Sequence, residues 1–120
     1  MNTHIQTSPA QCSSAMHALT LYKATSFAAR LRGLHAYGGL PWHAGLYIAA
    51  CKAIHTFGLS YSIDVVFLNS RHQVLMQRHH LQPWRVACCA AAAAVVELPA
   101  GYCLACPDYH LAIHAALASG

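Results

Sequence analysis

The stretch Ile54–Met76, IHTFGLSYSIDVVFLNSRHQVLM, contains the segment that decides the fold. Within it, IDVVFL at Ile63–Leu68 combines β-branched and aromatic residues, which are enriched in β-strands. Apolar side chains would occupy both faces of this strand: Ile63, Val65 and Phe67 on one, Val66 and Leu68 on the other. A strand that is apolar on both faces is normally central in a β sandwich or barrel.

The residues on either side of this segment predict further short strands. Asn69–His72 has the composition of a turn, so Gln73–Gln77 is expected to return as the partner of a hairpin. Four other segments have strand-like patterns: Met16–Tyr22, Gly45–Cys51, Trp84–Cys88 and Val95–Leu98. Together they predict a mainly β fold.

Helix is expected in one or two short pieces. Thr25 or Ser26 can cap a helix over Phe27–Leu34, whose large apolar residues recur with helical spacing. The alanine run Ala90–Ala94 has high helix propensity but is short, so a helical turn and a loop both remain open. We therefore expect a flexible N-terminus over residues 1–14 and one compact β-rich domain over residues 15–120.

Composition limits the possible partners. Of the 120 residues, 57% are hydrophobic and only 8% are charged, against about 25% charged in average proteins. A surface with so little charge favours association, either with itself as a homo-oligomer or with a partner. The seven basic residues are scattered along the chain, which argues against nucleic-acid binding.

The location predicted from the sequence is the cytoplasm. The N-terminal residues lack the basic and apolar regions of an export signal. The longest apolar run, Val86–Val96, is too short for a membrane span, which needs about 20 residues. We therefore expect the six cysteines, Cys103 and Cys106 included, to be reduced.

Several short motifs follow one another in an order that resembles the prokaryotic family named domain of unknown function 192. They are RLRGL at Arg30–Leu34, IHTFGL at Ile54–Leu59 with Cys51 just before it, IDVVFL, PWR at Pro83–Arg85, and ELPAG at Glu97–Gly101. The resemblance implies a compact sandwich or barrel of jelly-roll type, and a family without an agreed activity. Ala50 and His72 stand where the family often has proline and glycine, and the C-terminal tail departs from its pattern.

Asp64 is one of only three acidic residues, yet it lies inside the apolar strand. A buried carboxylate must be paired or neutral. The resemblance places His55, Thr56, Arg85 and Glu97 with it. This set is either a structural cluster that joins strands or the polar end of a ligand cleft. We expect the His55–Thr56 segment or Arg85 to hold Asp64.

Three functions remain open. The leading one is a non-catalytic binding or accessory module for a protein or small ligand, because two tryptophans and six tyrosines offer aromatic surface. The second is a small hydrolase-like enzyme using His55, Asp64 and Cys51. In it, the cysteine would be the nucleophile, the histidine the base and the aspartate the orienting acid. The third is a metal-binding tail formed by four side chains with an irregular spacing, which are Cys103, Cys106, His110 and His114. No cofactor or bound metal is expected.

Overall fold

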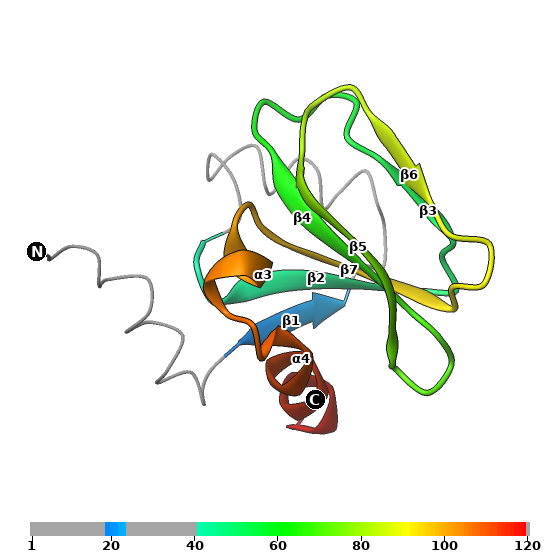
Figure 1. The fold of residues 1–120 in the computed structure, drawn as a ribbon, viewed down its shortest axis with the longest axis vertical. Helices are drawn as coiled ribbons and strands as arrows, with labels where there is room; N and C mark the ends of the chain where they lie inside the picture. Colours follow the sequence, from blue (N-terminus) through cyan, green and yellow to red (C-terminus); the bar gives the residue numbers. More distant parts are fainter. Residues whose placement is uncertain (1–18, 24–40, 120) are drawn as a thin grey trace, which may run out of the picture.

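The computed structural model describes residues 19–23 and 41–119. The helix expected over Phe27–Leu34 and the N-terminal residues 1–14 lie outside these ranges. Within them, the chain forms seven strands and two helices, labelled as in Figure 1. The prediction of a mainly β fold is confirmed.

The main sheet has five strands, in the order β1-β2-β7-β4-β5. Their bounds are β1 Thr20–Lys23, β2 Ala44–Ala49, β7 Ala94–Pro99, β4 Ile63–Leu68 and β5 Val74–Leu81. β1 runs parallel to β2, and the other neighbouring pairs are antiparallel. β4 lies between β7 and β5 and all six of its residues are buried, so it is an interior strand covered on both faces, as its sequence predicts.

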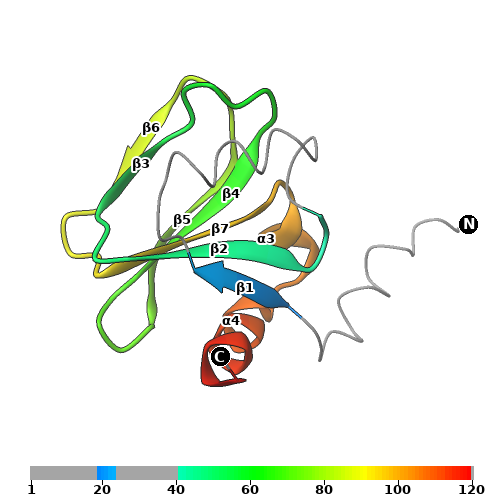
Figure 2. The same ribbon diagram turned by 180° about the vertical axis from the view of Figure 1, so that it is seen from behind.

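Two further layers cover the main sheet (Figures 1 and 2). A second sheet, formed by β3 (Ala53–His55) and β6 (Val86–Cys88), lies over one face. The helices α3 (Tyr102–Ala105) and α4 (Tyr109–Ser119) lie against the other face. The architecture is a β sandwich with a helical layer, and neither sheet closes into a barrel.

The alternation of β4 divides the core into two clusters. Val66 and Leu68 pack with Tyr102, Cys103 and other residues of the helical layer. On the opposite face, residues of β4 pack against the β3–β6 layer, and this second cluster contains Ile63, Val65, Phe67, Ile54 and Ala87. Burying one such side chain stabilises a fold by about 1.5–3 kcal/mol, so both faces of β4 contribute to stability.

Most predicted strands are present with shifted ends. β1 begins at Thr20, and residues 16–18 of the predicted strand lie outside the described ranges. β2 ends before Cys51, and β5 continues to Leu81. Ala90–Ala93 forms turns rather than a helix, because Ala92 donates to the carbonyl of Cys89 and β7 starts directly afterwards. Sequence patterns did not predict β3 or α4.

The β4–β5 hairpin turns as expected and uses a left-handed residue. His72 has φ 62°, a conformation that costs a residue with a Cβ some free energy. Its ring contacts the hydroxyl of Tyr47 at 3.0 Å, and its amide donates to Asn69. The carbonyl oxygen of the Asn69 side chain accepts the amides of Arg71 and Gln73. These bonds offset the strain that glycine would avoid.

Cysteine states differ along the chain. Cys51, Cys88, Cys89 and Cys103 are free thiols. Cys106 is disulfide-bonded, so the expectation that Cys103 and Cys106 are both reduced is wrong for Cys106. The thiol of Cys103 therefore remains available for chemistry that Cys106 cannot take part in.

None of the helices in the described ranges has the length and apolarity needed to cross a bilayer.

Candidate functional site

The five residues predicted to form one site lie in three places. Asp64 faces the helical layer, because it alternates with Ile63 and Val65 of the opposite cluster. Glu97 faces the other side of the main sheet, since its register partner is Val65 and not Asp64. The remaining three, His55, Thr56 and Arg85, belong to the β3–β6 layer and the turn before it. The structure therefore does not bring the predicted set together.

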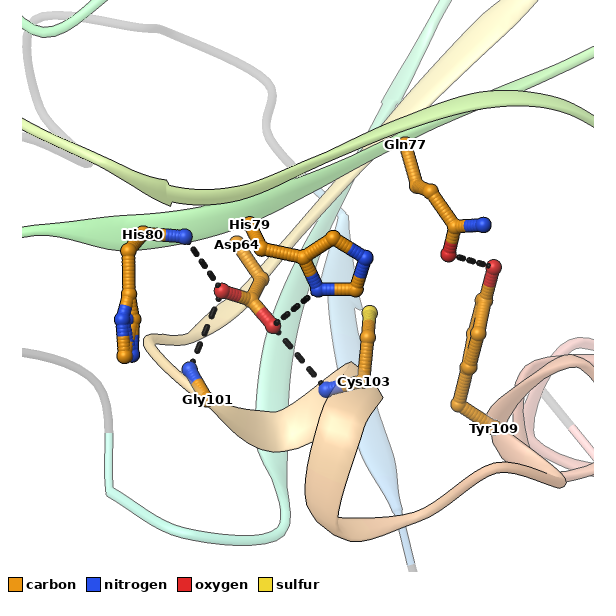
Figure 3. Close-up of polar contacts among 7 residues, drawn as sticks. All are labelled: Asp64, Gln77, His79, His80, Gly101, Cys103 and Tyr109. Atoms are coloured by element: carbon orange, nitrogen blue, oxygen red, sulfur yellow. Dashed lines mark hydrogen bonds and ion pairs between the residues drawn. The ribbon is translucent and has the colours of Figure 1, made fainter.

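Three backbone amides donate hydrogen bonds to the carboxylate of Asp64 (Figure 3). One carboxylate oxygen accepts the amides of His80 and Gly101 at 2.9 and 3.0 Å, and the other accepts the amide of Cys103 at 2.9 Å. The side chain is 0% exposed. The prediction of a buried, hydrogen-bonded carboxylate is confirmed, but the partners expected for it, His55–Thr56 or Arg85, are wrong.

A bulge in the hairpin explains these partners. Ile63 pairs with Leu81 and Val65 pairs with Arg78, so two residues of β5 lie opposite Asp64 alone. Such a bulge re-aims side chains and breaks the regular ladder. The two residues are His79 and His80, and His80 has φ 52°. Its amide thereby turns toward the carboxylate.

Two side chains with reactive atoms complete this cluster. The Nδ1 atom of His79 lies 3.9 Å from the second carboxylate oxygen, and the His79 side chain is 33% exposed. The Sγ atom of Cys103 lies within 4.8 Å of both. Burial, the charge of Asp64 and a hydrogen bond to Asp64 all raise the pKa of the Cys103 thiol, which is therefore neutral at pH 7. We call Asp64, His79 and Cys103 the Asp64 triad.

Tyr109 of α4 borders the triad. Its hydroxyl donates to the side-chain oxygen of Gln77 (Figure 3). Burial, followed by the charges of Cys103 and Asp64, raises the pKa of Tyr109 to about 12. The phenol is thus a neutral donor that ties α4 to β5 beside the thiol.

Glu97 is buried in the opposite core with 2% exposure. Burial raises the pKa of Glu97 to about 7, and the nearby Tyr61 has a pKa raised to about 12 by burial and then by Glu97. A carboxyl group in this position takes up a proton near neutrality, which lowers the cost of keeping it inside the sandwich.

Thr56 joins the end of β3 to the turn before β6. Its amide donates to the carbonyl of Arg85 at 2.9 Å, and its hydroxyl accepts the Arg85 amide at 2.9 Å and donates to the carbonyl of Gln82 at 2.7 Å. Its carbonyl accepts the amide of Trp84 at 3.3 Å. The fully buried Thr56 therefore fixes a turn whose other side chains face solvent.

Exposed side chains on and around this turn form a surface that we call the aromatic surface. We define it as His55, Phe57, Trp84 and Val86. Phe57 and Trp84 stack with ring centroids 5.5 Å apart, and His55 lies against Phe57 at 4.8 Å. Val86 is the register partner of His55. Phe57 is 43% exposed and Trp84 is 66% exposed, so two large rings stand in water.

The catalytic and tail-metal hypotheses receive no support from the geometry. Cys51 packs with the core of the β3–β6 side and its thiol donates to the carbonyl of Ala53, whereas Asp64 faces the helical layer. In the tail, the ring of His114 contacts the carbonyl of His72 at 2.6 Å. Across the described ranges, the group of possible metal ligands that the structure assembles is the Asp64 triad, and Cys103 is its one residue from the tail.

Sequence reasoning missed the roles of Phe57 and His79. Phe57 lies inside the motif IHTFGL, but its exposure is not visible in the pattern of apolar residues. His79 and His80 form a pair in a strand that the sequence predicts to end earlier, at Gln77. The signal that was available is the adjacent histidine pair His79–His80, whose second member lies 16 residues after the buried acid.

Comparisons with known proteins identify the family. The sequence profile of domain of unknown function 192, described as "Uncharacterized ACR", matches residues 10–106. The chain therefore belongs to this uncharacterised family. None of the curated proteins matches the chain.

Two solved structures share the fold. A "putative transcription regulator" from Sinorhizobium meliloti is 19% identical with a TM-score of 0.62, and the match covers 73% of this chain and 74% of that one. A protein of unknown function from Novosphingobium aromaticivorans is 16% identical with a TM-score of 0.56, over 70% of this chain. The match spans 64% of that second protein's length. At these identities the likeness concerns the fold.

Proposed function

We propose that this member of the domain of unknown function 192 family is a non-catalytic binding module that docks an acidic protein partner on the aromatic surface. The observation that carries the proposal is the stacked pair Phe57 and Trp84, which is exposed on the β3–β6 layer. Aromatic residues are enriched at interfaces and dominate the binding free energy where they are buried by a partner.

The backbone supports a binding role for Trp84. Trp84 has φ 64°, a left-handed conformation that costs a residue with a Cβ roughly 1–2 kcal/mol. The hydrogen bonds of Thr56 to Trp84 and Arg85 hold the turn in this conformation. Strain kept at an exposed ring, which adds little to the core, is typical of functional positions.

Charge defines the chemistry of the partner. Of the three acidic residues, Asp64 and Glu97 are 0% and 2% exposed, which leaves Asp108 as the exposed acidic side chain. The exposed basic residues of the described ranges are Lys23, Lys52, Arg71, Arg78 and Arg85. Because Arg85 follows Trp84 directly, a partner with carboxylates around an apolar patch fits this surface.

The proposal divides the predicted binding residues into two groups. His55 and Arg85 would contact the partner, and Thr56 would position the turn that presents them. Asp64 and Glu97 would act inside the folded scaffold, away from the partner. The proposed function is thus the leading one predicted from the sequence, but the partner would bind at the aromatic rings and not at Asp64.

Site-specific photo-crosslinking in cells tests the proposal. A photoreactive phenylalanine analogue at position 84 should crosslink an acidic protein, and the same analogue at Leu104 of the helical layer should not. Leu104 is a matched control because it is 69% exposed, close to the exposure of Trp84. With the purified partner, Trp84→Ser and Arg85→Glu should each weaken binding at least about ten-fold, and Leu104→Ser should not.

Three results would contradict the proposal. They are crosslinks at position 84 to DNA, crosslinks to a second copy of this chain as the sole product, and an unchanged affinity of Trp84→Ser for the crosslinked protein. The second would assign the aromatic surface to a homo-oligomer, which the low surface charge also favours.

The cytoplasm is the location we propose for this activity. Disulfides form and persist in oxidising compartments and are rare in the cytosol. Thiol trapping in living cells tests this location, because Cys106 is disulfide-bonded in the structure. A Cys106 disulfide trapped in cells would place the protein in an oxidising compartment instead.

A further inference from the structure

The Asp64 triad has the composition of a transition-metal site. It combines a carboxylate oxygen, an imidazole nitrogen and a thiol sulfur, whose atoms all lie within 4.8 Å of one another. We propose that Asp64, His79 and Cys103 bind one zinc ion. Zinc takes sulfur, nitrogen and oxygen ligands in this combination, whereas magnesium and calcium prefer oxygen alone.

The geometry is close to the one that zinc requires. In a tetrahedral site with bonds of about 2.0–2.3 Å, ligand atoms lie roughly 3.3–3.6 Å apart. The carboxylate oxygen of Asp64 and the Nδ1 atom of His79 are 3.9 Å apart. A shift of less than about an ångström in the His79 ring closes this gap, and the ring can move because its side chain is 33% exposed.

Asp64 supplies a fixed half of the site. The oxygen that accepts the amides of His80 and Gly101 has both lone pairs engaged. The other oxygen accepts the Cys103 amide and faces the ring nitrogen of His79 at 3.9 Å (Figure 3). Ligands oriented by such outer hydrogen bonds bind metals more tightly, because less freedom is lost on binding.

Charge balance also favours a divalent ion. The site combines one carboxylate and one thiol, whose ligand atoms lie within 4.8 Å of each other and of the His79 nitrogen. When Zn²⁺ binds, the Sγ–H bond breaks, the sulfur–zinc bond forms and the proton leaves to solvent. The carboxylate and thiolate then neutralise the two charges of the ion, which suits a buried site. A tetrahedral zinc ion held by three protein ligands would take one further ligand, such as water.

This site differs from the tail site considered from the sequence. Of the four tail residues, Cys103 alone takes part, and its partners come from β4 and β5. It is also independent of the aromatic surface, which lies on the layer across the main sheet.

Cobalt titration of the full chain under anaerobic conditions tests the proposal. Co²⁺ substitutes for zinc and shows a thiolate charge-transfer band when sulfur is a ligand. The wild-type chain should bind one Co²⁺ with this band, and one Zn²⁺ should displace it. Cys103→Ser should lose the band, and His79→Gln should weaken binding at least about ten-fold.

Two matched variants act as controls. Cys88→Ser removes an exposed free thiol of the β3–β6 layer, and His80→Gln changes the neighbouring ring while keeping the amide that holds Asp64. Both should retain the band and the affinity. The proposal is wrong if the wild type binds no Co²⁺, if Cys103→Ser keeps the band, or if Cys88→Ser loses it. Should Cys103→Ser not fold, His79→Gln decides: unchanged affinity in that variant overturns the site.

Discussion

Replacing Asp64 with alanine should destabilise the protein more than any other loss of a single acid. Three backbone amides, of His80, Gly101 and Cys103, would lose their acceptor. The Cys103 bond is buried and the other two are partly buried. A buried unsatisfied donor costs about 1–3 kcal/mol, and a partly hydrated one costs less. The expected loss is therefore roughly 2–5 kcal/mol of the 5–15 kcal/mol typical of a domain.

Asp64→Asn should fall between alanine and the wild type. The single amide oxygen can still accept two amides where the carboxylate now accepts those of His80 and Gly101. The new amide nitrogen would then face the amide of Cys103, so one donor stays unsatisfied. The expected loss is roughly 1–3 kcal/mol.

Urea unfolding followed by far-ultraviolet circular dichroism measures both losses, with Asp108→Asn as the control. Asp108 is exposed, so its replacement should change stability by less than about 0.5 kcal/mol. If Asp64→Ala also loses less than about 0.5 kcal/mol, Asp64 is not the buried acceptor described above. If Asp64→Asn is as unstable as Asp64→Ala, the two-amide arrangement at one oxygen is wrong.

Three further predictions concern a buried acid and two positions of tight backbone. Because burial raises the pKa of Glu97 to about 7 from an ordinary value of 4.5, the folded state holds the proton longer than the unfolded chain. Stability should therefore fall as pH rises from about 4.5 to 7, by up to roughly 3 kcal/mol. Glu97→Gln should remove the part of this loss of stability that Glu97 causes. If the curves of unfolding free energy against pH were parallel for the two proteins, this prediction would be wrong. Ala50 has φ 52° and donates its amide to Ala93, so Ala50→Gly should gain about 0.5–1 kcal/mol and Ala50→Pro should lose about 3 kcal/mol or more; the opposite order of melting temperatures would contradict this. A Cβ at Gly45 would lie 2.8 Å from the carbonyl oxygen of Glu97. Gly45→Ala should therefore lower the free energy of unfolding by about 1–3 kcal/mol in urea. An unchanged urea midpoint would mean that β2 and β7 can move apart to accommodate the methyl group.

The β4 strand shows what could be predicted from the sequence. Its residue types favour strand, and its apolar side chains at every position except Asp64 require cover on both faces. Both signals are local, so Ile63–Leu68 predicts a central strand with the bounds that the structure has. The hairpin turn at Asn69–His72 follows from local chemistry in the same way.

The composition of the site could not be predicted in this way, because it depends on register. Pairing β4 with β7 sets Asp64 beside Leu98 and Val65 beside Glu97, which sends the two acids to opposite faces. A shift of one residue would have put them on one face, as the family resemblance suggested. No local pattern in either strand specifies that offset.

The partners of Asp64 depend on tertiary structure for a related reason. The bulge in β5 turns the amide of His80 toward Asp64, and the loop after β7 brings the amides of Gly101 and Cys103 from 37 and 39 residues away. The sequence by itself determined the strand and the need to pair its buried carboxylate. Only the folded chain decided which amides pair with it, because hydrogen bonds between distant residues form only after the strands have aligned and the helical layer has packed.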